Sequence, residues 1–137
     1  MLAIDAQHDV ATATAALHDS AIGKVEIVCL TPSMQPNVSL NAERLGRYAN
    51  RHIEIRDIAG DRMETSLISA VEKLKVKQGE YDPDLHFGIK FYNRSSGNPL
   101  TSIYLDRWGK LGTVNGVTVA ISPELLKWAK TNIAICF

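Results

Sequence analysis

Two histidines on separate expected strands are the residues of this chain best suited to acid–base chemistry. His52 shares one face of its segment with Glu54 and Arg56, and His86 shares a face of another segment with Lys90. If these strands are neighbours, the histidines could serve as acid and base at a phosphate, with the cations on its developing charge. Any half-exposed strand also requires polar residues at alternate positions. We prefer this second interpretation, and a small metal-independent hydrolase or nuclease stays as an alternative.

The two cysteines, Cys29 and Cys136, are too few for a metal site or a dense disulfide framework. Their spacing matches no C-x-x-C motif, and Cys29 lies in an apolar segment that disfavours a reactive thiolate. We therefore expect two separate thiols. The alternative is a bridge that ties the carboxy-terminal tail to the first strand, which requires an oxidising compartment.

Motifs for metals, cofactors and covalent catalysis are missing from the sequence. The four histidines form neither H-x-x-x-H nor H-E-x-x-H, and no G-x-S-x-G nucleophile motif is present. The chain also lacks the G-x-x-x-x-G-K-[ST] and G-x-G-x-x-G loops that hold phosphates. We expect no metal, no cofactor and no catalytic residue.

An aromatic residue beside an arginine at a turn is typical of an interface anchor. Trp108 follows Arg107 in a D-R-W-G turn, and Tyr92 with Arg94 makes a second such pair at the other end of a neighbouring strand. We interpret these four residues as candidate partner-binding residues. The alternative is that Trp108 folds back over the sheet edge and covers adjacent leucines.

The segment that would position these residues is a meander over 85–121. Period-2 alternation and turn signals predict four antiparallel strands, at 85–93, 100–105, 110–114 and 117–121. Asn115-Gly116 predicts a type I′ hairpin, because that turn needs positive φ at both central positions. Gly109 can likewise take positive φ and begin a bulge. A near-continuous apolar run at 25–30 predicts a further buried strand, and 52–58 predicts an edge strand or a buttressing loop.

Four helices are expected around this sheet, over 6–17, from Asn41, over 61–77 and over 122–131. Asn41 is a plausible N-cap, Asp61 with Glu64 predicts a capping box, and Ser122 before Pro123 predicts another N-cap. We expect the 61–77 helix to lie across the apolar face of the meander and the last helix to close an end. The predicted fold is α+β in one domain over 1–137, with helices on one face and at the carboxy terminus.

The composition is that of an ordinary globular chain, with 45% apolar and 22% charged residues among 137. Fifteen basic residues balance fifteen acidic ones, so nothing attracts nucleic acid or an anionic membrane in general. No apolar run approaches the roughly 20 residues of a membrane span. The first twenty residues lack the basic start and apolar core of a signal peptide. We expect a cytoplasmic protein, or a periplasmic or secreted one if an export signal has been removed.

These absences favour a non-enzymatic domain that binds another protein. Its most concrete form is a specific inhibitor, such as an immunity protein that neutralises a cognate bacterial toxin. A dedicated inhibitor needs a stable scaffold and a complementary surface, and it needs no catalytic motif. Two alternatives stay open: the hydrolase based on His52 and His86, and an exported binding domain with a Cys29–Cys136 disulfide.

Overall fold

The computed structural model describes residues 3–34, 36 and 38–137, and within them seven strands form one antiparallel sheet. The strand order is β2-β1-β4-β5-β6-β7-β3, so β2 and β3 lie at the two edges. The strands are β1 (Ile22–Cys29), β2 (Arg51–Arg56), β3 (Val76–Gln78), β4 (Leu85–Asn93), β5 (Pro99–Asp106), β6 (Leu111–Val114) and β7 (Val117–Ile121). The helices are α1 (Ala3–His18), α2 (Ala42–Tyr48), α3 (Glu64–Glu72) and α4 (Glu124–Asn132), with short 3-10 turns η1 (Ile58–Gly60) and η2 (Ala134–Cys136).

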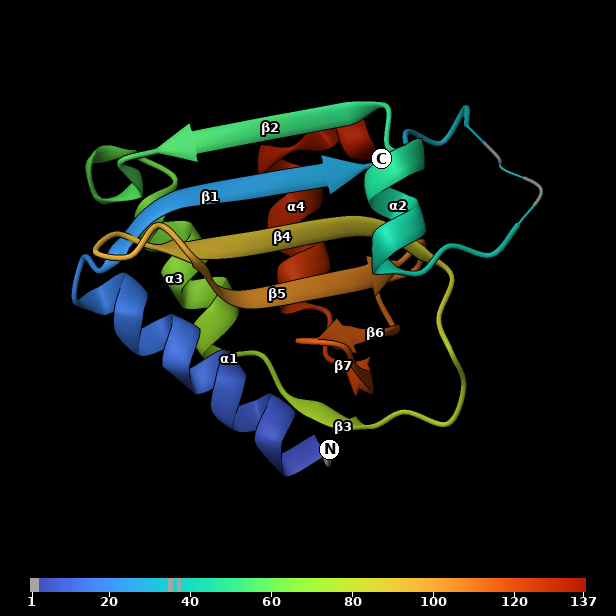
Figure 1. The fold of residues 1–137 in the computed structure, drawn as a ribbon, viewed down its shortest axis with the longest axis horizontal. Helices are drawn as coiled ribbons and strands as arrows, with labels where there is room; N and C mark the ends of the chain where they lie inside the picture. Colours follow the sequence, from blue (N-terminus) through green and yellow to red (C-terminus); the bar gives the residue numbers. More distant parts are fainter. Residues whose placement is uncertain (1–2, 35, 37) are drawn as a thin grey trace.

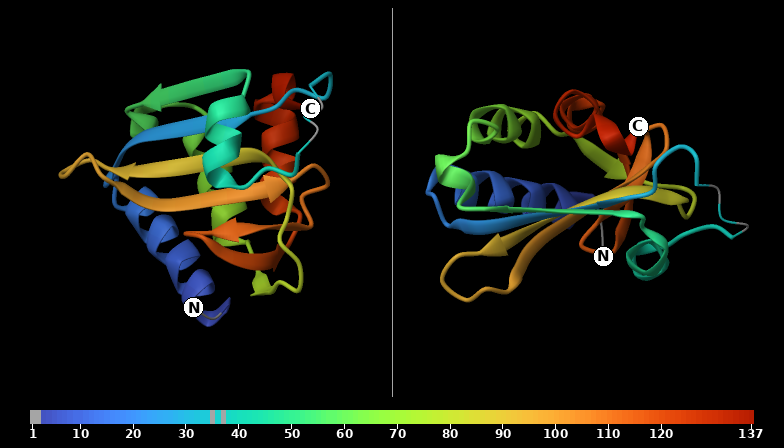
Figure 2. Two further views of the ribbon diagram at one scale, coloured as in Figure 1. Left: turned by 45° about the vertical axis from the view of Figure 1, so that its right-hand side comes forward. Right: turned by 90° about the horizontal axis from the view of Figure 1, so that it is seen from above.

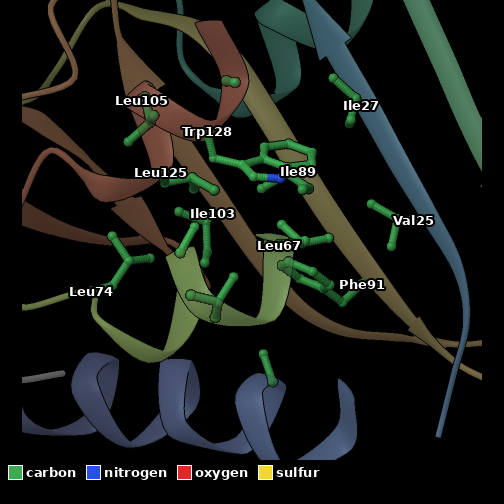
Figure 3. Close-up of a cluster of buried hydrophobic side chains, with 14 of the residues drawn as sticks. Val25, Ile27, Leu67, Leu74, Ile89, Phe91, Ile103, Leu105, Leu125 and Trp128 are labelled. Carbon is green, nitrogen blue, oxygen red and sulfur yellow. The ribbon is translucent and has the colours of Figure 1, made fainter. Parts of the chain in front are cut away.

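Helices cover both faces of the sheet (Figures 1 and 2). The side chains of α1, α3 and α4 pack with one face of the sheet in the larger apolar cluster, part of which Figure 3 shows. Leu67 of α3 and Trp128 of α4 are buried there, over Ile89 and Ile103 of the central strands. Burying this apolar surface provides the main driving force for the three-layer arrangement.

The α+β prediction is confirmed, and so are the four strands of the meander and the strand near 25–30. The segment at 52–58 contributes the edge strand β2, which pairs with β1. Asn115 and Gly116 have φ values of 47° and 84°, as a type I′ turn requires, and Gly109 has a φ of 66°.

The expected helix over 61–77 is wrong in its second half. The helix α3 ends at Glu72, and the chain then forms β3, which pairs with β7. Without β3, the outer edge of β7 would present unpaired backbone groups. Leu74 is buried in the core, and its spacing from the buried Leu67 and Val71 also suits a helix, which explains the longer helix expected from the sequence.

Two of the predicted caps are also wrong, whereas the cap at Asn41 is confirmed. The Asn41 side chain accepts a hydrogen bond from the backbone N–H of Arg44 at 2.8 Å. The Ser122 hydroxyl instead accepts from the backbone N–H of Lys75 at 2.8 Å, and so holds the start of β3 beside the end of β7. Asp61 accepts from the N–H of Met63, and Glu64 returns no bond among the described residues.

The expectation that helices pack on one face and close an end needs a correction. The helix α2 lies on the face opposite to α3 and α4 (Figure 2). Its Leu45 is buried in a second cluster with Leu40, Val28, Leu85 and Tyr104. Leu40 and Leu45 therefore dock α2 onto the sheet. The carboxy-terminal helix α4 lies beside α3 rather than across an end.

The expectation of two separate thiols is wrong, because Cys29 and Cys136 form a disulfide. Cys29 is the last residue of β1, and Cys136 lies in η2 just after α4. Their Cα atoms are 5.8 Å apart, within the usual range for a disulfide. In Figure 1 the carboxy-terminal end of the chain lies beside the tip of β1. The bridge fixes η2 to the end of the sheet.

Across the described part of the chain, no helix is both long enough and apolar enough to span a membrane.

Candidate functional site

The turn that joins β5 to β6 is held in place by its own residues and by α4. The carboxylate of Asp106 is buried and accepts a hydrogen bond from the N–H of Lys110 at 3.0 Å. Gly109 adopts a positive φ and packs so closely on Leu126 of α4 that a Cβ at this position would overlap the leucine side chain. The two residues between them, Arg107 and Trp108, are therefore carried by an ordered turn.

Trp108 projects from this turn, with 67% of its surface exposed. The guanidinium of Arg107 lies 5.9 Å from the centre of the indole ring, within the range of a cation–π contact. With that exposure, Trp108 covers little of the sheet edge. The turn thus presents an aromatic side chain and a cation together at the surface.

Two hollows lie on either side of Trp108. The first, here called the aromatic hollow, has a volume of about 720 Å³ and runs from Trp108 to Tyr81, over Leu111 and Ala120. Tyr81 follows β3 and is 71% exposed. Two exposed aromatic rings therefore flank an apolar floor, with Lys110 among the polar lining residues.

The second, here called the cationic hollow, has a volume of about 480 Å³. Its lining includes residues just after β1, near the start of β4 and in the turn from β5 to β6. Figure 1 shows that these segments lie at the same end of the sheet. Its apolar lining comes from Trp108 and Phe137, together with loop residues after β1, and its basic lining comes from Arg107, Lys130 and His86. Cys136 lines it too, so the disulfide holds one wall of the hollow in place.

The wall formed by the last residues is packed as well as bridged. The ring of Phe137 lies 5.7 Å from that of Phe87 on β4, centroid to centroid. On the opposite side, Nε2 of His86 lies 3.2 Å from a carboxylate oxygen of Asp84. The second oxygen of Asp84 accepts from the N–H of Leu40 at 2.7 Å. The imidazole is thus held by a carboxylate that is itself fixed.

The other predicted pair, Tyr92 and Arg94, lies at the opposite end of β4 from the Trp108 turn. Arg94 donates hydrogen bonds to the carbonyl oxygens of Ser20 and Ile22 and to the carboxylate of Asp57. These bonds tie the α1–β1 connection to the loop after β2. The structure therefore presents Arg107 and Trp108 together on one turn, whereas the exposed Arg94 bonds to other segments of the chain.

Tyr92 belongs to a polar row on the sheet. Its hydroxyl donates to Glu26 at 3.3 Å, and the ammonium of Lys24 lies 4.1 Å from the ring centre. Burial, followed by the negative charge of Glu26, raises the pKa of Tyr92 above its ordinary value. The same two causes, in the same order, raise the pKa of Tyr104.

The two candidate acid–base histidines are separated by a strand. His52 on β2 pairs in register with Val28 of β1, whereas His86 is on β4, on the other side of β1. His52 is exposed, and its neighbour Glu54 pairs with Arg56 and Lys24. Across the described residues, no three His, Cys, Asp or Glu side chains gather to hold a metal ion.

Tyr81, Lys130 and Phe137 line the two hollows and were not among the candidate residues from the sequence. Tyr81 reaches Trp108 because β3 adds to the sheet beside β7. Lys130 lines the cationic hollow from the last turn of α4, and Phe137 lines it because the disulfide holds the segment after α4 at the end of β1. The pairing of Cys29 with Cys136 is the sequence signal that could have indicated the position of Phe137.

Comparison with protein-family models, with curated proteins and with solved structures gives no match to this chain.

Proposed function

We propose that this chain is a non-enzymatic domain that binds another protein through the end of the sheet around Trp108. Its most concrete form is a dedicated inhibitor, such as an immunity protein that neutralises a bacterial toxin. The proposed surface consists of the Arg107–Trp108 turn, Tyr81, and the aromatic and cationic hollows, both of which Trp108 lines.

The observation that carries this proposal is the exposure of Trp108 on an ordered turn. Tryptophan and arginine are the residues most enriched among those that dominate binding energy in protein interfaces. A rigid aromatic side chain loses little conformational entropy when it is buried by a partner. The adjacent hollows offer concave surface for the partner's side chains.

The disulfide supports a place for this domain in an oxidising compartment. Disulfides persist in the periplasm and outside the cell, and they are rare in the reducing cytoplasm. The Cys29–Cys136 bridge also holds one wall of the proposed surface. We therefore propose the periplasmic or secreted location, which the sequence left open as the alternative to a cytoplasmic one.

The hydrolase alternative has less support. His52 and His86 lie on strands that flank β1, and the carboxylate of Asp84 holds His86. A general acid and a general base must both reach one reacting group within hydrogen-bond distance. The separation of His52 and His86 by β1 therefore favours the binding domain over the hydrolase.

A photo-crosslinking amino acid at position 108 tests the proposal in the organism that makes the chain. The control position is Tyr48, an aromatic residue on α2 that is 51% exposed. We expect a discrete cross-linked product with one protein from position 108 and none from position 48. Products from position 48 alone, or from neither position, would contradict the proposal.

A further inference from the structure

The cationic hollow holds two basic side chains that have no acidic partner. Arg107 and Lys130 both line it, and neither forms an ion pair or a hydrogen bond with any residue that the structure describes.

Two acidic residues lie close in sequence to the lining residues of this hollow, and both already accept hydrogen bonds. Asp84 holds His86 and the N–H of Leu40, and Asp106 holds the N–H of Lys110. None of the lining residues has an acidic side chain. The side chains of the hollow therefore carry an excess of positive charge in a chain whose basic and acidic side chains balance.

We infer that the cationic hollow receives an acidic segment of the partner protein, with a carboxylate between Arg107 and Lys130 and an apolar side chain against Trp108 and Phe137. This inference rests on the proposed function and adds the chemistry of the partner's contact residues. Complementary charge at such a rim fixes orientation and raises the association rate.

The lining favours a protein carboxylate over a phosphate of nucleic acid or lipid. The two cations stand beside the rings of Trp108 and Phe137 and beside Leu30 and Pro32, so much of the contact surface is apolar. An amphipathic peptide segment can satisfy both parts. A polyphosphate surface is bound instead through many cations along a backbone. This hollow presents only two cations, Arg107 and Lys130, beside its apolar lining.

Two capped ten-residue peptides test the inference without the natural partner. One contains two leucines flanked by four glutamates, and the other carries glutamines in place of the glutamates. The ¹⁵N-labelled, disulfide-bonded chain is titrated with each peptide and, separately, with inorganic phosphate. The reporters are the indole N–H of Trp108 and the backbone amides of Arg107 and Phe137.

We expect saturable shifts of these signals with the glutamate peptide and roughly tenfold weaker binding of the glutamine peptide, as two exposed ion pairs imply. The double substitution Arg107→Gln with Lys130→Gln should weaken binding of the glutamate peptide by the same factor. Arg62→Gln, at an exposed arginine before α3, should leave binding unchanged.

Equal binding of both peptides at Trp108 would overturn the inference and leave the docking surface of the proposed function standing. Shifts with phosphate but not with the glutamate peptide would overturn it as well, in favour of a phosphate ligand. The proposed function fails separately, if cross-linking from position 108 yields no product.

Discussion

Cys29 and Cys136 are joined across 107 positions of sequence, and this bond connects the end of β1 to the segment that completes the cationic hollow. The same segment carries Phe137, whose ring lies against Phe87 of β4. Stability and the proposed docking surface therefore depend on one covalent link.

Removing this link should lower the free energy of unfolding by about 2–5 kcal/mol, because a loop of this length is costly to close without it. The measurement is urea unfolding of the parent chain with and without dithiothreitol. The double substitution Cys29→Ser with Cys136→Ser is the control, since added reductant should not change its midpoint. Two reactive thiols in the unreduced, unfolded parent would contradict the bridge.

Tyr104 lies over the backbone of Gly88 on the neighbouring strand, so that a Cβ on Gly88 would overlap the ring. Gly88→Ala should therefore destabilise the fold by about 1–3 kcal/mol, as overpacking does. Gly46→Ala in α2 is the matched control, because no atom lies within 4 Å of its added Cβ. Gly46→Ala should raise the free energy of unfolding by about 0.5–1 kcal/mol. Chemical denaturation gives the free energy of unfolding of both variants. Equal changes in the two variants would contradict the close packing of Tyr104 on Gly88.

Alkaline pH should destabilise the protein through Tyr92 and Tyr104. Burial, then Glu26, raises both pKa values in the folded chain, so the unfolded chain loses these protons first. Their contribution is complete below about pH 10, the ordinary tyrosine value, and is lost as the pH rises beyond it. Unfolding measured from pH 8 to 11 should show a smaller alkaline loss for Tyr104→Phe, which keeps the ring over Gly88. An unchanged loss would contradict the raised pKa of Tyr104.

The two tryptophans should differ sharply in their effect on stability. Trp128 is buried and donates a hydrogen bond from Nε1 to Ser66 at 3.0 Å, so Trp128→Ala should cost about 3–5 kcal/mol. Trp108→Ala should change stability by less than about 1 kcal/mol, because its ring is mostly in water. If Trp128→Ala fails to fold, Trp128→Phe should still lower the unfolding midpoint more than Trp108→Ala. A larger loss from Trp108→Ala would mean that its ring is part of the core.

Local signals explain why the meander could be predicted. The turn at Asn115 and Gly116 requires positive φ at both residues, and alternation then sets which side of each strand is buried. The placement of β3 could not be predicted in this way. Its pairing with β7 is a contact between distant segments, and Leu74 is buried whether or not the helix continues.

The candidate site shows the same division between local and distant information. The interpretation of Arg107 and Trp108 as candidate binding residues rests on composition and turn geometry, which are both local. Tyr81 and Lys130 were not among the candidates, since the edge strand β3 and the helix α4, which are distant in sequence from the turn, carry them to the two hollows. Tyr92 and Arg94 have the same composition as the turn pair, and only the structure shows that they bond to Glu26, Ser20 and Asp57.

The most direct test of the docking surface is the affinity of the partner cross-linked at position 108, measured by calorimetry for the parent chain, Trp108→Ala and Tyr48→Ala. A central tryptophan contributes at least about 2 kcal/mol, so Trp108→Ala should weaken binding roughly 30-fold or more. Tyr48→Ala should bind as the parent does. Parent-like affinity of Trp108→Ala would contradict the account.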